Sequence, residues 1–181
     1  MLYKFLLLSD EIDNFVREIE IDSEATFLSF QNAILESVGY SKGELTAFFI
    51  CSDNWEKEQE ITLFEMDTDS SVDSYLMADT KLEELVSSEG QRLLFVFDNL
   101  TERAFFIEMK AIIPGKTLVN PVCTLSQGKA PEQTIDLDKF MAEIQTSTNF
   151  DTDFYGSDDY NEDELDEESF GGLSVNEIEE L

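Results

Sequence analysis

The distribution of charge along the chain most constrains how it can fold. Residues 1–135 hold 10 basic and 25 acidic residues, whereas residues 136–181 hold one basic and 16 acidic residues. Beyond residue 145 there is no Lys or Arg, against 13 Asp and Glu. Low apolar content and strong self-repulsion keep a segment from folding alone. We therefore predict a folded domain over residues 1–135 and an acidic tail over 136–181 that is disordered or partly helical, with the helix at 136–144.

The charge of the whole chain excludes several classes of function. The net charge is −30 and the pI is near 4.1. Because affinity for nucleic-acid phosphates comes from Lys and Arg, we expect no direct binding of nucleic acid. The chain has no histidine, so imidazole bases, His-containing zinc sites and Ser-His or Cys-His pairs are ruled out. We expect no catalytic residue, no bound metal and no cofactor.

The cysteines and the amino terminus indicate a cytoplasmic location. Cys51 and Cys123 are the only cysteines, which is typical of reduced thiols and not of a secreted disulfide framework. The first apolar run is interrupted by Lys4 and followed by acidic residues, which predicts a strand in place of a signal peptide. No apolar run approaches the roughly 20 residues that span a bilayer, so we expect no contact with a membrane.

Hydrophobic periodicity predicts six strands and two helices in the domain. The strands are expected at 3–8, 15–21, 45–51, 61–66, 92–98 and 104–113. A helix is expected at 26–38, with an apolar stripe of residues three and four apart and with Gly39 at its end. Leu82, Leu85 and Val86 suit a short second helix.

The order of these elements predicts the fold class. The order strand-strand-helix-strand-strand-helix-strand-strand lacks the alternation of stacked βαβ units. We therefore predict an α+β fold with a mainly antiparallel sheet, two packed helices and an acidic C-terminal extension. Pro114, Pro121 and Pro131 predict an irregular segment between the last strand and the tail.

Four stretches resemble a known family in sequence and in order. The strand at 3–8 with F-V-R-E-I-E-I at 15–21 is similar to the family's opening strand and its V-W-R-x-I-x-V strand. T-F-L-S-F-Q-N-A-I-L-E-S-V-G-Y at 26–40 resembles its T-L-x-x-L-H-x-x-I helix, and a short strand at 45–49 follows. K-L-E-E-L-V-S-S-E-G-Q-R-L-L-F-V-F-D at 81–98 resembles the helix and strand that end in Y-x-Y-D-F-G-D. C-T-L-S-Q-G-K-A-P-E-Q at 123–133 resembles its C-x-x-G-x-G-x-x-P-P-E-D loop.

These stretches identify the chain as a divergent member of the plasmid open-reading-frame-three-like family, named after a root-inducing plasmid. The resemblance covers about residues 1–133 and implies a fold; it carries no reaction. Members are often labelled as passenger proteins of insertion elements, which implies a mobile-element accessory protein. Asp98 matches the signature, but N-L-T-E-R-A-F then replaces the family's F-G-D-x-W-x-H.

Two residues of the domain are candidates for binding. Asp98 ends an apolar strand, where a carboxylate either caps the next turn or faces a pocket together with Tyr40 and Cys123. Trp55 is the only tryptophan and lies in a charged turn. It either anchors a partner or folds back over the sheet edge. The acidic stretch at 67–73 lacks the glycine and the glutamate of a calcium loop, which favours a plain acidic loop.

The tail carries the remaining candidates. Tyr155, Tyr160 and Phe170 lie among acidic residues, a composition typical of segments that fold onto a basic, apolar groove. The alternatives are a tail that only keeps the chain in solution, and a mimic of DNA whose carboxylates occupy a partner's phosphate-binding surface. The leading hypothesis is a non-enzymatic protein-interaction module whose acidic tail binds a basic partner. The second is a small-ligand-binding or enzymatic domain with a pocket near Asp98, and the third is a mobile-element accessory protein.

Overall fold

The computed structural model describes residues 1–64 and 75–134. The predicted tail at 136–181, its helix at 136–144 and the acidic stretch at 67–73 lie outside the described residues. The predicted boundary at residue 135 falls where the described residues end and stays a prediction. In the described part of the chain, no helix is both long enough and apolar enough to cross a membrane.

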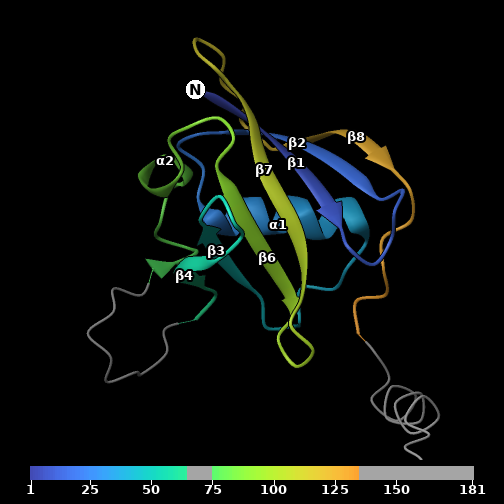
Figure 1. Ribbon diagram of the computed structural model, residues 1–181. Helices are drawn as coiled ribbons and strands as arrows, with labels where there is room; N and C mark the ends of the chain where they lie inside the picture. Colours follow the sequence, from blue (N-terminus) through green and yellow to red (C-terminus); the bar gives the residue numbers. More distant parts are fainter. Residues whose placement is uncertain (65–74, 135–181) are drawn as a thin grey trace, which may run out of the picture. The chain divides into compact units, whose positions relative to one another are not determined.

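A single eight-stranded sheet forms the body of the fold (Figure 1). Its strands lie in the order β5-β4-β3-β6-β7-β1-β2-β8. All neighbours pair antiparallel except β4 and β5. The strands are β1 Leu2–Ser9, β2 Val16–Asp22, β3 Ala47–Cys51, β4 Lys57–Thr62, β5 Tyr75–Leu76, β6 Arg92–Asp98, β7 Arg103–Ile113 and β8 Val122–Gln127.

One long helix covers one face of the sheet. The helix α1, Phe27–Val38, lies behind β6 and β7 in Figure 1. The hydroxyl of Thr26 accepts a hydrogen bond from the amide of Ser29 and caps its start, and Gly39 ends it with φ at 73°. Its buried stripe packs on alternate side chains of the central strands. The large side chains of this core include Tyr3, Phe5, Phe30, Phe48, Phe95 and Phe105.

The fold is α+β with a mainly antiparallel sheet, as predicted, but the predicted order of elements is wrong in detail. Two strands, β5 and β8, were not expected, and the second helix, α2 (Leu82–Leu85), is a single turn. The strand expected at 61–66 lies at Lys57–Thr62, because its first half is polar and exposed and so lacks an apolar signal. The strand β8 lies between Pro121 and Pro131, within the segment that was predicted to be irregular from its prolines.

A buried arginine joins the helix, β2 and β8. Arg17 lies in β2 and is 5% exposed. Its guanidinium donates to the carbonyl oxygens of Ser37 at 3.1 Å, Gln127 at 2.6 Å and Gly128 at 3.0 Å. It also lies 4.5 Å from the ring centroid of Phe15. Because Ser37 is in the last turn of α1, the cation sits where the helix dipole favours positive charge.

Gly128 lets the chain that follows β8 come close to the backbone just before β2. Its φ is 72°, and a Cβ atom there would lie 2.3 Å from the carbonyl oxygen of Asn14. Only glycine fits such an approach. Together with Arg17, this contact holds the edge strand β8 in place.

Replacing Arg17 with Met should destabilise the domain by about 2 kcal/mol, because the carbonyl groups at the helix end and in β8 lose their donor. Urea unfolding measures the loss, and hydrogen exchange of the amides of residues 122–127 should become faster. Lys42→Met is the matched control, since the Lys42 side chain is 57% exposed and its surface ion pair contributes little. Equal stability of the two variants would contradict this role of Arg17.

Candidate functional site

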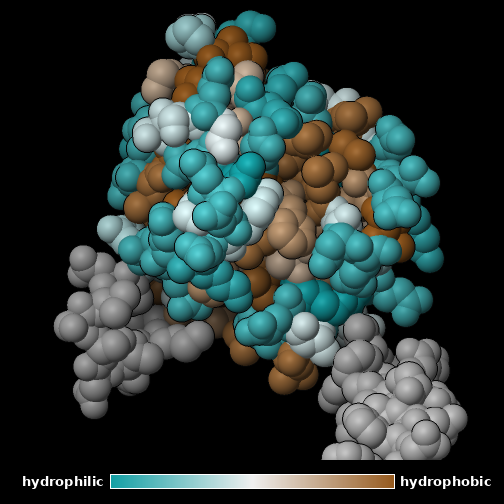
Figure 2. Space-filling model, viewed as in Figure 1, coloured by the Kyte–Doolittle hydropathy of each residue, from teal (hydrophilic) through white to brown (hydrophobic). Residues whose placement is uncertain are grey.

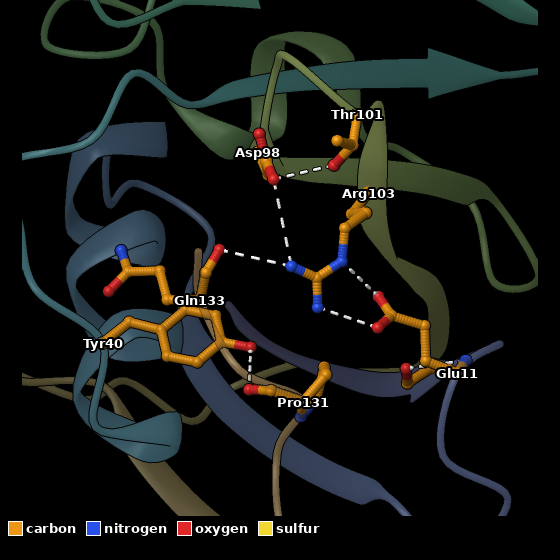
Figure 3. A network of polar contacts seen from close by, with 8 residues as sticks. Glu11, Tyr40, Asp98, Thr101, Arg103, Pro131 and Gln133 are labelled. Carbon is orange, nitrogen blue, oxygen red and sulfur yellow. Dashed lines mark hydrogen bonds and ion pairs between the residues drawn. The ribbon is translucent and has the colours of Figure 1, made fainter. Parts of the chain in front are cut away.

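A network of polar contacts surrounds Arg103 at the turn between β6 and β7 (Figure 3). The Arg103 side chain is 10% exposed and donates two hydrogen bonds of 2.8 Å to the carboxylate of Glu11. One guanidinium nitrogen lies 3.9 Å from Asp98 and 3.5 Å from the carbonyl oxygen of Gln133. The guanidinium carbon lies 5.0 Å from the ring centroid of Phe97. A single cation at the start of β7 thus contacts Glu11, the end of β6 and Gln133.

Asp98 makes the contacts of a turn cap inside this network. One carboxylate oxygen accepts from the amide of Leu100 at 3.0 Å, and the other accepts from the hydroxyl of Thr101 at 2.7 Å. These bonds close the tight connection between β6 and β7. Each oxygen of Asp98 thus accepts one hydrogen bond from the turn.

Tyr40 fills the space beside this network. Its ring lies 5.3 Å from that of Phe97 and 5.9 Å from that of Phe105, measured between centroids. Its hydroxyl donates to the carbonyl oxygen of Pro131 at 2.7 Å. Burial raises the pKa of Tyr40 well above its usual range, although the positive charge of Arg103 opposes the shift. Tyr40 is therefore a neutral, packed side chain at neutral pH.

The predicted pocket of Asp98, Tyr40 and Cys123 is not assembled as a unit. Tyr40 and Asp98 both lie beside Arg103, whereas Cys123 is exposed on β8, with its thiol 3.2 Å from the carbonyl oxygen of Leu125. A groove of about 400 Å³ runs beside Tyr40, lined by residues 38–40 and 129–134, and neither Asp98 nor Cys123 lines it. In the described part of the chain, no group of His, Cys, Asp and Glu is arranged to hold a metal ion.

Segment 130–134 is attached to the domain at this place. The side chain of Gln133 accepts from the amide of Ser41 at 2.8 Å and donates to the carbonyl oxygen of Ser41 at 2.9 Å. Pro131 accepts from Tyr40, and Gln133 accepts from Arg103. The polar groups of the network thus bind one another and hold the chain where the described residues end.

Trp55 lies against the sheet face that α1 leaves open. The Trp55 ring packs edge-on against the ring of Phe106, with 4.9 Å between the two centroids. The guanidinium carbon of Arg92 lies 5.1 Å from the centroid of the Trp55 ring. Trp55 and Phe49 cover a small second core made of Cys51, Leu94, Val96 and Ala104. The ring is folded back, onto a face of the sheet and not its edge, and the role of Trp55 as an anchor for a partner stays a prediction. The φ of Trp55 is 65°, in the left-handed region that residues other than glycine adopt uncommonly.

An apolar row crosses this open face and was not predicted. It runs over five neighbouring strands and consists of Phe49, Leu94, Phe106, Leu8 and Val16, each paired with the next. Figure 2 shows apolar side chains on this face beside polar ones. The signal in the sequence is the unbroken apolar run at 93–97, because a strand with one solvated face alternates apolar and polar residues. Leu8, next to the last residue of the row, remains 42% exposed.

Tyr155, Tyr160 and Phe170 lie outside the described residues. Their assignment to partner binding stays a prediction.

Replacing Tyr40 with Phe should cost about 1 kcal/mol at pH 7, through the lost hydrogen bond to Pro131. The pKa of Tyr40 is higher in the folded chain than the value of about 10 in the unfolded chain. The folded chain thus keeps a proton that the unfolded chain releases, so the contribution of Tyr40 is complete below pH 10 and falls as the pH rises further. Urea unfolding should show that the difference in free energy of unfolding between the wild type and Tyr40→Phe is smaller at pH 10.5 than at pH 7. An advantage that does not change with pH would contradict the buried phenol.

Comparisons with known proteins place the chain in a family. The model of the family described as plasmid pRiA4b ORF-3-like protein matches residues 5–168, which extends past the predicted domain boundary. The crystal structure of a protein of unknown function, MM3350 from Methanosarcina mazei Go1, is similar with a TM-score of 0.60 and 18% sequence identity. That match covers 83% of this chain and 84% of the other, and it shows a shared fold. No curated protein matches. The resemblance found in the sequence is confirmed: the chain belongs to the plasmid pRiA4b ORF-3-like family.

Proposed function

We propose that this protein is a non-enzymatic interaction module that binds a basic partner protein. The observation that carries the proposal is how the domain uses its few cations. Residues 1–64 and 75–134 contain 10 basic and 21 acidic residues. Most of the basic side chains are engaged within the domain, so the charge left to face a partner is negative.

The contacts of the cations support this view. Lys4 lies 3.1 Å from Glu18 and 3.0 Å from Glu20. Three more cations lie in ion pairs, namely Lys42, Arg103 and Lys110. Arg17 binds carbonyl groups, while Lys57 and Arg92 lie over aromatic rings. Exposed acidic residues such as Glu24, Asp53 and Glu56 have no ion pair within the described residues. A surface of one sign attracts partners of the other and speeds their association.

In this proposal the tail adds to the negative charge of the domain. Residues 136–181 carry 16 acidic residues against one basic residue. The proposal assigns the first encounter with the basic partner to these charges, and Tyr155, Tyr160 and Phe170 to the apolar contacts that follow. It includes a cytoplasmic location for the protein.

The hypothesis of an enzyme or a small-ligand site draws little support from the Arg103 network. Each oxygen of Asp98 accepts a hydrogen bond within the turn, and the hydroxyl of Tyr40 donates its proton to the carbonyl oxygen of Pro131. A general acid or base needs a polar atom that can reach a substrate. The role of a mobile-element accessory protein rests on the label of the family alone.

Three full-length baits test the proposal by affinity capture with cross-linking in the native cell. The first is the wild-type chain, the second has the 13 acidic residues beyond residue 145 changed to Asn and Gln, and the third has residues 146–181 scrambled at constant composition. We expect the wild-type chain to capture a basic protein and the neutralised bait to lose at least 90% of it. The scrambled bait keeps the charge of the tail but changes the order of its residues. Recovery equal to that of the wild-type chain would therefore assign the binding to charge alone, whereas a loss would assign it to the order of the aromatic residues as well. Equal recovery with the wild-type and neutralised baits would refute binding through the tail.

A further inference from the structure

We propose that β8 accepts a basic, extended segment of the partner as a ninth strand of the sheet. This inference rests on the basic partner proposed above and specifies where and how that partner binds. Among the described residues, β8 pairs with β2 on one side and has no neighbouring strand on the other. A strand at a sheet edge presents backbone N–H and C=O groups that an extended peptide can pair with.

The composition of β8 lacks the features that usually block an edge. Its sequence V-C-T-L-S-Q contains no charge and no proline, and its six residues are all exposed. The opposite edge of the sheet is different, because β5 is only two residues long. Natural proteins protect edges with charged residues, prolines or very short strands. A neutral six-residue edge in a chain of net charge −30 is thus the less protected of the two.

The edge is held in a pairing geometry before any partner arrives. Arg17 binds the carbonyl oxygens of Gln127 and Gly128, and Gly128 closes against Asn14. The hydroxyl of Thr124 donates to the carboxylate of Glu18 at 2.6 Å, at the bulge in the pairing of β2 and β8. A preorganised strand loses less conformational entropy on binding than a mobile one.

Side chains beside the edge define what the incoming strand should carry. Val122 and Leu125 are 46% and 42% exposed and lie opposite Glu20 and Glu18 of β2. Apolar residues of the incoming strand would cover Val122 and Leu125, since side chains of neighbouring strands pack on the same face. The charge of the chain selects basic residues for the remaining positions.

The charge also argues against a second copy as the occupant. Joining two copies through their β8 strands would bring together two chains of net charge −30. Like charges repel across an interface, whereas a basic segment gains from the same field. A basic partner strand is therefore the occupant to which the structure points.

The probe is a fluorescein-labelled octapeptide of four Lys-Val repeats, and its control is the same peptide with every backbone nitrogen methylated. Both peptides carry the same charge and side chains, but the control donates no backbone hydrogen bond. Titration into the full-length, nitrogen-15-labelled protein is followed by fluorescence anisotropy and by NMR. We expect the methylated peptide to bind at least tenfold more weakly, and the unmethylated peptide to shift and protect the amides of residues 122–127.

Two lysine substitutions complete the test. Leu125→Lys places a charge on the edge strand, and Val119→Lys places the same charge on a side chain that is 97% exposed outside it. We expect at least a tenfold loss of affinity for the first and less than threefold for the second.

Four outcomes would overturn the ninth strand. Equal affinity for both peptides, with shifts confined to residues 136–181, leaves the basic-partner function intact and removes β8 from it. Equal losses for the two lysine variants also remove β8, since charge alone would then explain the binding. Shifts of residues 122–127 that depend on protein concentration without peptide would assign the edge to a second copy. Absence of binding by either peptide would count against the ninth strand and the basic-partner function together.

Discussion

The buried guanidinium of Arg17 is the contact on which the arrangement of the domain depends. It joins the last turn of α1 and the strand β2 to the end of β8, which lies 110 residues beyond Arg17 in the chain. Its charge is compensated by backbone carbonyl groups, with the aromatic face of Phe15 beside it. Because buried polar groups are costly when unpaired, this arginine and the carbonyl groups around it stabilise each other. This contact and the pairing with β2 hold β8 at the edge of the sheet that residues 1–64 and 75–134 form.

The two faces of the sheet differ in what covers them. The helix α1 and a large aromatic core occupy one face. The other face carries a smaller core beneath Trp55 and an apolar row that includes the exposed Leu8 and ends at Val16. A sheet that is apolar on both faces but covered by a helix on only one has surface available for another molecule. This asymmetry is consistent with a domain that works by association.

The electrostatics of the domain lead to the same view. Most of its basic side chains lie in ion pairs, over aromatic rings or on carbonyl groups, and Arg103 makes several such contacts at once. Acidic side chains remain on the surface. Polar clusters that look like candidate sites in the sequence, Asp98 above all, stabilise turns and connections. This is the charge distribution on which the proposal of a basic partner rests.

The sequence alone predicted the elements whose signal is local. The helix at 26–38 was predictable because its apolar stripe, its Thr26 cap and its terminal Gly39 all act within a few residues. The strand Arg92–Asp98 was predictable because it is a strongly apolar run. Family membership was also within reach, since it rests on the order of motifs along the chain.

Tertiary structure alone decided the rest. The alternation in F-V-R-E-I-E-I places Arg17 on the same side as Phe15 and Ile19, but only the carbonyl groups supplied by α1 and β8 make its burial possible. Strand β8 has a neutral sequence between prolines, and it becomes a strand because β2 offers it hydrogen bonds. The contact of Trp55 with Phe106 is likewise made between groups whose meeting the local sequence did not predict. Local propensity acts over a few residues, whereas these outcomes depend on groups up to about a hundred residues apart in the chain, which no local pattern encodes.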